Sequence, residues 1–351
     1  KTHRFEITLL NSLALTGKGH LTDDVIERSL DPIKVTFLTE IDVKKHPNTM
    51  IIKGFDAEEQ VIFLKEVQSV GGGSIVFVGE SLTEQHLYPH QTFNEAHDFK
   101  AYLKLVWDHM KQAIEKGIQV QGVLPGPLKL KRKAYDLFHK SMKHEPSEIT
   151  ENRLVSAYAY AVSEENASGG IIVTAPTCGA CGIVPAVLYY MQQKHAFITE
   201  TRIIDALAVA GLIGNLIKHN ASISGAVAGC QAEVGSACAM ASAAHATLFK
   251  LSMDQVEYAA EIALEHHLGL TCDPVNGYVQ IPCIERNAVA ALRAIDACGL
   301  SYFLSDSRRV SLDTVIQTMY QTGLDMHTSY KETSLGGLAY HFKEEDDVNC
   351  W

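Results

Sequence analysis

Three stretches of the chain combine helical spacing with an unusual density of alanine, glycine and serine. They read DALAVAGLIGN from residue 205, AEVGSACAMASAAHA from residue 232 and NAVAALRAIDACG from residue 287. Small side chains allow helices to approach closely, and a helix that is apolar on most sides must lie inside a domain. The sequence therefore predicts a helical domain built around a buried helix of small residues.

The first part of the chain has a different sequence pattern. From about residue 4 to 80, short runs with hydrophobic alternation are separated by turn formers: RFEITLLNSLAL, KVTFLTE, NTMIIKG, QVIFLKEV and SIVFVGE. One helix is expected among these β-rich runs, over residues 23–29. From residue 93 onward, helical periodicity dominates, with further helices predicted over 149–166, 183–194, 200–218, 231–249, 254–267, 283–304 and 311–323.

The β-rich pattern and the helical pattern together predict an α+β fold with two domains. The first is a small α+β domain over residues 1–92, and the second is a larger all-α domain over residues 93–351 that carries a C-terminal tail. The loops that join the predicted helices hold most of the glycine, proline, cysteine and threonine of the second domain, and such loops are where a site on a rigid scaffold is expected.

The charge of the chain limits the kinds of molecule that it is expected to bind. A net charge of −11, with no stripe of lysine and arginine, argues against a nucleic-acid binder and favours small molecules. The longest apolar runs are interrupted by polar residues, so we expect no membrane span, and no signal peptide is apparent. A cytoplasmic location is therefore expected. The chain opens at Lys1 rather than methionine, and a preceding segment is expected.

Eight cysteines are too few for a disulfide scaffold in a chain of 351 residues. Cys238 and Cys298 fall inside alanine-rich helices and are expected to be small core residues. By contrast, Cys230, Cys272 and Cys283 lie in loops at helix boundaries. They could be buried thiols or metal ligands, and their separations match neither a zinc-finger nor a ferredoxin pattern. Three thiolates on a four-iron cluster would leave one iron open as a Lewis acid.

The segment TAPTCGACG contains a further pair of thiols, Cys178 and Cys181. A CxxC pair could be a thioredoxin-like redox site, but that function needs a βαβ setting, and the surroundings here are helical. We instead expect Thr174, Thr177 and the backbone amides of the next helix to contact a substrate.

Four segments of the helical region resemble the iron–sulfur L-serine dehydratases, also called L-serine ammonia-lyases. They are TAPTCGACGIVPAVLYY, NASISGAVAGCQAEVGSAC, EHHLGLTCDPVNGYVQIPCIERNAVAA and VSLDTVIQTMYQTGLDMHTSYKETSLGGLA. In the first domain, LNSLALTGKGHLTDD and QSVGGGSIV resemble the same family more loosely. The resemblance implies dehydration of L-serine to pyruvate and ammonia at an oxygen-sensitive [4Fe-4S] cluster, without pyridoxal phosphate, in a homodimer.

The resemblance also implies roles for individual residues. Cys230, Cys272 and Cys283 fall at the positions of the three cluster ligands, and Cys350 suits a removable fourth ligand. His20 in TGKGHLTDD is the expected base, with His266 and His267 as alternatives. The expected substrate or cluster contacts are Lys18, Thr174, Thr177, Asn220, Ser222, Ser224, Arg286, Lys331, Glu332 and Thr333.

Two other classes of function remain open from the sequence. A lyase of the same fold could act on L-cysteine, L-threonine or another β-substituted amino acid. A regulatory protein that binds a metal or a cluster without catalysis would leave the KGH and YKETS motifs without a role.

Overall fold

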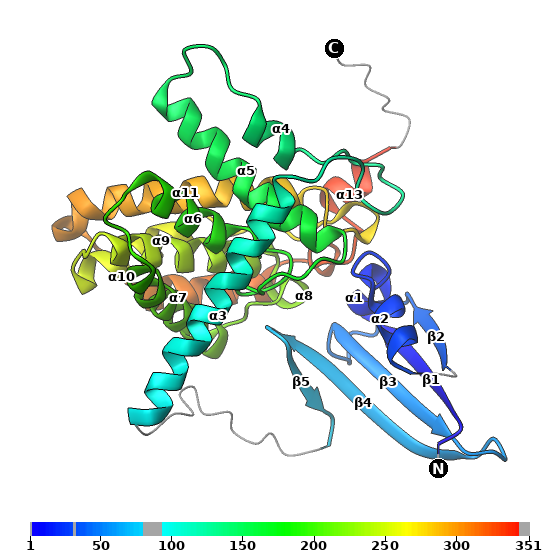
Figure 1. The fold of residues 1–351 in the computed structure, drawn as a ribbon. Coiled ribbons are helices and arrows are strands. Elements are labelled where there is room, and N and C mark those ends of the chain that lie inside the picture. Colours follow the sequence, from blue (N-terminus) through cyan, green and yellow to red (C-terminus); the bar gives the residue numbers. More distant parts are fainter. Residues whose placement is uncertain (1, 31–32, 80–92, 344–351) are drawn as a thin grey trace.

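The computed structural model describes residues 2–30, 33–79 and 93–343 (Figure 1). The N-terminal unit is a five-stranded mixed sheet in the order β2-β1-β3-β4-β5. Its first two neighbours, β1 and β2, run parallel, and the other pairs are antiparallel. The strands are β1 (Arg4–Leu10), β2 (Ile33–Leu38), β3 (Asn48–Phe55), β4 (Val61–Gly71) and β5 (Ser74–Phe77).

Two short helices cover part of this sheet, whereas the sequence predicts one. The helix α2 (Thr22–Ser29) agrees with the prediction, but α1 (Asn11–Thr16) replaces the second half of the expected strand RFEITLLNSLAL. The strand ends because Asn11 adopts a left-handed φ of 53°, a conformation that asparagine tolerates better than most residues. Its side chain also donates to the Asp42 carbonyl at 3.0 Å and accepts from the Asp42 amide at 2.7 Å.

The rest of the described chain is helical, and the predicted α+β class is confirmed. The longer helices are α3 (Phe93–Gly117), α5 (Ser147–Ala167), α6 (Ile183–Lys194), α7 (Glu200–Asn220), α9 (Ser236–Leu248), α10 (Met253–Glu265), α11 (Cys283–Leu304) and α12 (Leu312–Asp325). Shorter helical pieces are α4 (Ala134–His139), α8 (Gly225–Ala228), the π-helical turn η1 (Gln231–Gly235), η2 (Val275–Gly277), η3 (Ser305–Ser307), η4 (Thr328–Tyr330) and α13 (Gly337–His341).

The predicted buried helix of small residues is α9. Its residues from Ser236 to Ala246 are all buried, and α6, α7, α10 and α11 pack around it. The predicted boundary at residue 92 lies outside the described residues, so the division into two domains stays a prediction.

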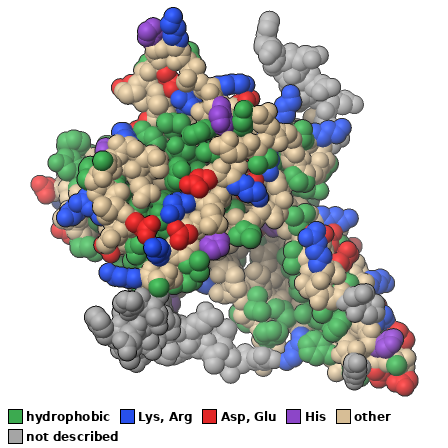
Figure 2. Space-filling model, viewed as in Figure 1, with side chains coloured by type: hydrophobic (Ala, Val, Ile, Leu, Met, Phe, Trp, Pro, Cys, Tyr) green, Lys and Arg blue, Asp and Glu red, His purple; other side chains and the backbone are tan. Residues whose placement is uncertain are grey.

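One described segment meets the length and composition criteria for a membrane span. It is Cys283–Ser307, with a mean hydropathy of 1.3, and it comprises α11 and the turn after it. Because α11 packs against α5, α9 and α10, its apolar composition also fits a core helix. The expectation that the chain has no membrane span therefore stays a prediction. On the face shown in Figure 2, lysine and arginine side chains are scattered among acidic and apolar ones.

Side-chain hydrogen bonds connect the sheet to the helical unit. The Ser12 hydroxyl donates to the Glu332 carbonyl at 2.7 Å, and Lys218 Nζ donates to the Ser74 hydroxyl at 2.6 Å. The glycine turn between β4 and β5 lies against the Ile223 side chain. These contacts place the α1–α2 turn and the β4–β5 turn beside the loops of the helical unit.

Candidate functional site

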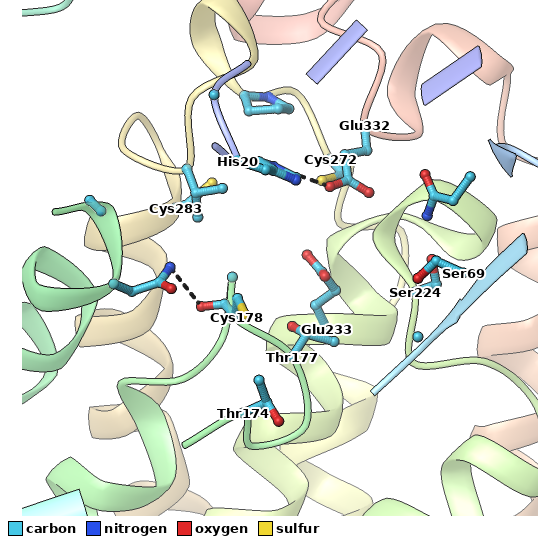
Figure 3. A pocket seen from close by; sticks show the side chains of 18 of the residues that line it. His20, Ser69, Thr174, Thr177, Cys178, Ser224, Glu233, Cys272, Cys283 and Glu332 are labelled. Atoms are coloured by element: carbon cyan, nitrogen blue, oxygen red, sulfur yellow. Dashed lines mark hydrogen bonds and ion pairs between the residues drawn. The ribbon is translucent and has the colours of Figure 1, made fainter. Parts of the chain in front are cut away.

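A pocket of about 290 Å³ lies where the sheet unit meets the helical unit (Figure 3). The sheet unit contributes His20, Asn48, Ser69 and the glycine turn over residues 71–73 to its lining. The helical unit contributes the loops that the sequence analysis singled out, so segments from residue 19 to residue 332 meet around one space.

The three loop thiols lie near one another beside this pocket. One ligand atom from each of Cys230, Glu233 and Cys272 lies within 4.8 Å of the other two. Cys272 and Cys283 line the pocket, and Figure 3 shows Cys283 on its opposite side from Glu233. A hydrogen bond that the Cys272 thiol donates to Cys230, together with burial, raises the pKa of Cys272, while burial and the nearby Cys230 raise that of Cys283. The charge of the nearby Arg286 acts against this rise in the pKa of Cys283.

Backbone contacts hold these thiols in place. Gln231, in the π-helical turn after Cys230, donates its side-chain amide to the Ala228 carbonyl and accepts from the Gly269 amide at 2.9 Å. Cys272 pairs with the YKETS segment, because its amide donates to the Tyr330 carbonyl and its carbonyl accepts from the Glu332 amide, both at 2.8 Å. Cys283 is the first residue of α11. π-Helical turns are frequent at functional sites.

Arg286 supports the cysteine loop from outside the pocket. Its guanidinium donates to the Thr271 carbonyl at 2.6 Å and to the Asp273 carboxylate at 2.9 Å. The same guanidinium lies close enough to Cys230 and Cys283 to interact with their charges. Arg286 is thus placed to fix Cys272 between two anchored neighbours and to offset negative charge on the thiols.

Two carboxyl groups, Glu233 and Glu332, face the pocket (Figure 3). Burial, followed by the charge of Glu332, raises the pKa of Glu233 to about 8. Burial, followed by the charge of Cys230, raises the pKa of Glu332 to about 8. The described lining of the pocket includes no lysine or arginine. The site thus concentrates thiol and carboxyl groups, which is a donor set suited to a metal centre.

His20 reaches the pocket from the α1–α2 turn. Its Nε2 lies 3.5 Å from Glu332 Oε1, and 27% of its side chain remains exposed. Burial lowers the pKa of His20 to about 4, so its imidazole is neutral near pH 7.

The backbone beside His20 packs directly on the cysteine loop. A Cβ atom on Gly19 would lie 2.0 Å from the Gly277 carbonyl oxygen, and one on Gly277 would lie 2.9 Å from the Leu15 carbonyl oxygen. Both positions therefore require glycine, which is what lets the His20 turn approach so closely.

We expect Gly19→Ala to lower the free energy of unfolding by about 1–3 kcal/mol, because the added methyl group would overlap a backbone carbonyl. Thermal unfolding would measure the change. Gly211→Ala on α7 is the control, since its Cβ would meet nothing within 4 Å. That control should be neutral or stabilise by up to about 1 kcal/mol. Equal stability of the two variants would contradict the close approach.

Several predicted contact residues point elsewhere in the described structure. Lys18 Nζ lies 5.4 Å from the centre of the Phe37 ring, and the Asn220 side chain donates to a carbonyl of its own helix at 2.9 Å. The Ser222 hydroxyl accepts from the Ser224 amide at 3.1 Å. None of Lys18, Asn220 and Ser222 is part of the described pocket lining.

Only some residues of the YKETS motif reach the pocket. Glu332 lines the pocket, whereas Lys331 Nζ donates to the Leu324 carbonyl at 3.4 Å and the Thr333 hydroxyl donates to carbonyls of η4. The alternative bases His266 and His267 each place Nδ1 against a carbonyl of α10, and neither is among the described lining residues.

Thr174, Thr177 and Ser224 do line the pocket. The Thr177 hydroxyl is buried without a hydrogen bond of normal geometry, although it lies near enough to Glu233 to affect the pKa of that carboxyl. Cys178 faces the pocket, and Cys181 is buried beneath it; both are free thiols. Cys350 lies outside the described residues.

Glu233 is not among the site residues that the sequence predicts. One signal could have found it, because it is the only acidic residue in AEVGSACAMASAAHA and stands three positions after Cys230. A lone carboxyl group in an otherwise apolar, buried segment is costly unless it has a partner or a function.

Comparison with known proteins finds relatives that align with most of the chain. Residues 37–339 match the family described as "Serine dehydratase alpha chain". The chain is 38% identical to "L-serine dehydratase" of Haemophilus influenzae, over 97% of this chain and 90% of that protein. It is 38% identical to "L-serine dehydratase 1" of Escherichia coli, over 96% and 89% of the two chains. For "L-serine dehydratase" of Streptomyces coelicolor the identity is 41%, over 85% and 73%.

Proposed function

The chain belongs to the L-serine dehydratase family, and on that premise we propose that it converts L-serine to pyruvate and ammonia. The observation that carries the proposal is one pocket lined by Cys272, Cys283, Glu233, Glu332 and His20, with the Cys230 thiol within 4.8 Å of ligand atoms of Cys272 and Glu233.

We propose that Cys230, Cys272 and Cys283 hold a [4Fe-4S] cluster. The residues fit such a group, because their thiols are buried, Cys230 and Cys272 lie within 4.8 Å of each other, and Arg286 lies beside them. When bound, the cluster would supply an iron without a protein ligand, which acts as a Lewis acid toward the serine hydroxyl. The described lining contains no lysine for a Schiff base, which supports chemistry without pyridoxal phosphate. Cys350 as a removable fourth ligand also stays a proposal.

His20 is the proposed base that removes the Cα proton of serine. It is neutral near pH 7, lines the pocket and lies beside Glu332, which can orient the ring. Loss of the Cα proton and of the β-hydroxyl, as water, leaves aminoacrylate. This product tautomerises to an imine, and addition of water then releases ammonia and pyruvate.

Oxygen exposure provides the test of this function. Protein purified without oxygen should be coloured by broad visible absorption and should release pyruvate from L-serine, and air should remove both properties. L-threonine and L-cysteine assayed beside L-serine would distinguish the related lyases. A colourless protein that remains active would contradict the iron–sulfur proposal, and a coloured protein without turnover on any of the three would favour the regulatory alternative.

We further propose that the protein acts as a homodimer in the cytoplasm on a small amino-acid substrate. Sedimentation of the oxygen-free protein would measure the first property, and a mass equal to one chain would contradict it.

A further inference from the structure

The pocket is lined by more acidic than basic side chains. Its described lining contains carboxyl and thiol groups and one imidazole, but no lysine or arginine. L-Serine carries both an ammonium group and a carboxylate. A pocket of this composition offers acidic side chains to the ammonium group, and binding of the substrate's carboxylate must depend on hydroxyls, amides or a bound metal.

Of the two carboxyl groups, Glu332 already has a partner. Its carboxylate lies 3.5 Å from His20 Nε2, and its backbone pairs with Cys272. No ion pair to Glu233 is found among the described residues, although its carboxyl group lies within 4.8 Å of two thiols. A buried carboxylate without a cation is unfavourable, so Glu233 is the group that a cationic ligand would stabilise most.

Glycine backbone forms two of the walls around Glu233, and the carboxyl packs closely against it. Cβ atoms on Gly179 and Gly225 would lie 3.1 Å and 3.0 Å from Glu233 Oε2, so a larger residue at either position would crowd this carboxyl. Figure 3 shows Glu233 extending toward the centre of the pocket with Thr177 beside it.

One further polar atom of the lining has no partner among the described residues, which independently indicates a ligand. Gln280 Oε1 is buried and accepts no hydrogen bond from them, although the Gln280 amide nitrogen donates to the Pro125 carbonyl at 2.7 Å. The Thr177 hydroxyl is also buried and lies beside the Glu233 carboxyl. The Gln280 residue is only 3% exposed and Thr177 is 9% exposed. Both oxygens can accept hydrogen bonds, and an ammonium group has three to donate.

We infer that Glu233 binds the α-ammonium group of the substrate and thereby selects 2-amino acids over 2-hydroxy acids. The inference deepens the proposed function, because it assigns a substrate-binding residue to the same pocket. It also assigns different tasks to the two glutamates: Glu233 recognises the substrate, and Glu332 positions His20.

Glu233→Gln, compared with the wild-type protein in its cluster-loaded form, tests this role. The substitution keeps the shape of the side chain and removes its charge. Because a hydrogen bond to a charged group contributes about 1.5–3 kcal/mol, we expect the KM for L-serine to rise about 10- to 100-fold. Glycerate, which has a hydroxyl in place of the amino group, should inhibit both proteins with similar constants. Glu261→Gln is the matched control, since Glu261 is also buried but lies on α10 outside the described lining.

Calorimetric titration with L-serine and with glycerate separates this inference from the proposed function. If the wild-type protein fails to release pyruvate but binds L-serine more tightly than Glu233→Gln does, the proposed function fails and the inference holds. Equal affinity of the two proteins for L-serine, or no binding to the wild type, would overturn the inference. So would loss of iron or of visible absorption in Glu233→Gln, because Glu233 would then be a cluster ligand.

Discussion

Cys272→Ser is expected to lose iron, visible absorption and pyruvate formation together. The Cys272 thiol is 3% exposed, lies within 4.8 Å of the Cys230 thiol and borders the pocket. A serine hydroxyl is a harder and much less acidic ligand than a thiol, so it binds the iron of a cluster much more weakly than a thiolate does. Changing an outer neighbour of a metal ligand typically costs 10- to 100-fold in affinity or activity, and we expect losing the ligand to reduce turnover by more than about 100-fold. Iron analysis, absorption spectra and pyruvate release would measure the three effects.

Cys238→Ser is the matched control for this prediction. Cys238 is also fully buried, but it lies inside α9 with its thiol 3.2 Å from the Ala290 carbonyl. Its serine variant should keep its iron, its colour and most of its activity. If Cys238→Ser loses iron while Cys272→Ser keeps it, the assignment of the cluster ligands is wrong.

His20→Asn should lower kcat by about 10²- to 10⁴-fold, the usual contribution of a general base. Asparagine preserves a polar side chain of similar size but cannot take up a proton. The cysteines are unchanged in this variant, so iron content and absorption should match the wild type. Single-turnover kinetics on oxygen-free protein would separate the loss of chemistry from any change in substrate binding.

His245→Asn provides a comparison with a second buried histidine. Burial lowers the pKa of His245 to about 4, as it does for His20, but His245 lies near the end of α9 and is not among the described lining residues. Its variant should lose stability rather than kcat. If His267→Asn lowers kcat more than His20→Asn does, the base is His267 rather than His20.

Much of the fold could be predicted because local pattern and tertiary packing agree. The run of small residues predicts the buried helix α9, and α11 begins at Cys283 as predicted. The helix α1 could not be predicted in this way, since LLNSLAL suits a strand as well as a helix. The left-handed Asn11, fixed by Asp42 far along the chain, decides between them.

The candidate site was only partly predictable for a related reason. In the turn that pairs with Cys272, Glu332 adopts a left-handed φ of 57°, and its side chain faces the pocket while Lys331 reaches the end of α12. Sequence alone does not say which of the two faces inward. Glu233 was missed because its partners, from loops near residues 177, 225 and 332, meet it only in the folded chain.

The proposed active site takes its residues from both units. All three proposed cluster ligands belong to the helical unit, whereas His20 belongs to the sheet unit, which meets the cysteine loop at the Gly19–Gly277 contact. The proposed chemistry therefore depends on how the two units dock. A change at this contact would displace the proposed base and leave every proposed cluster ligand in its own element.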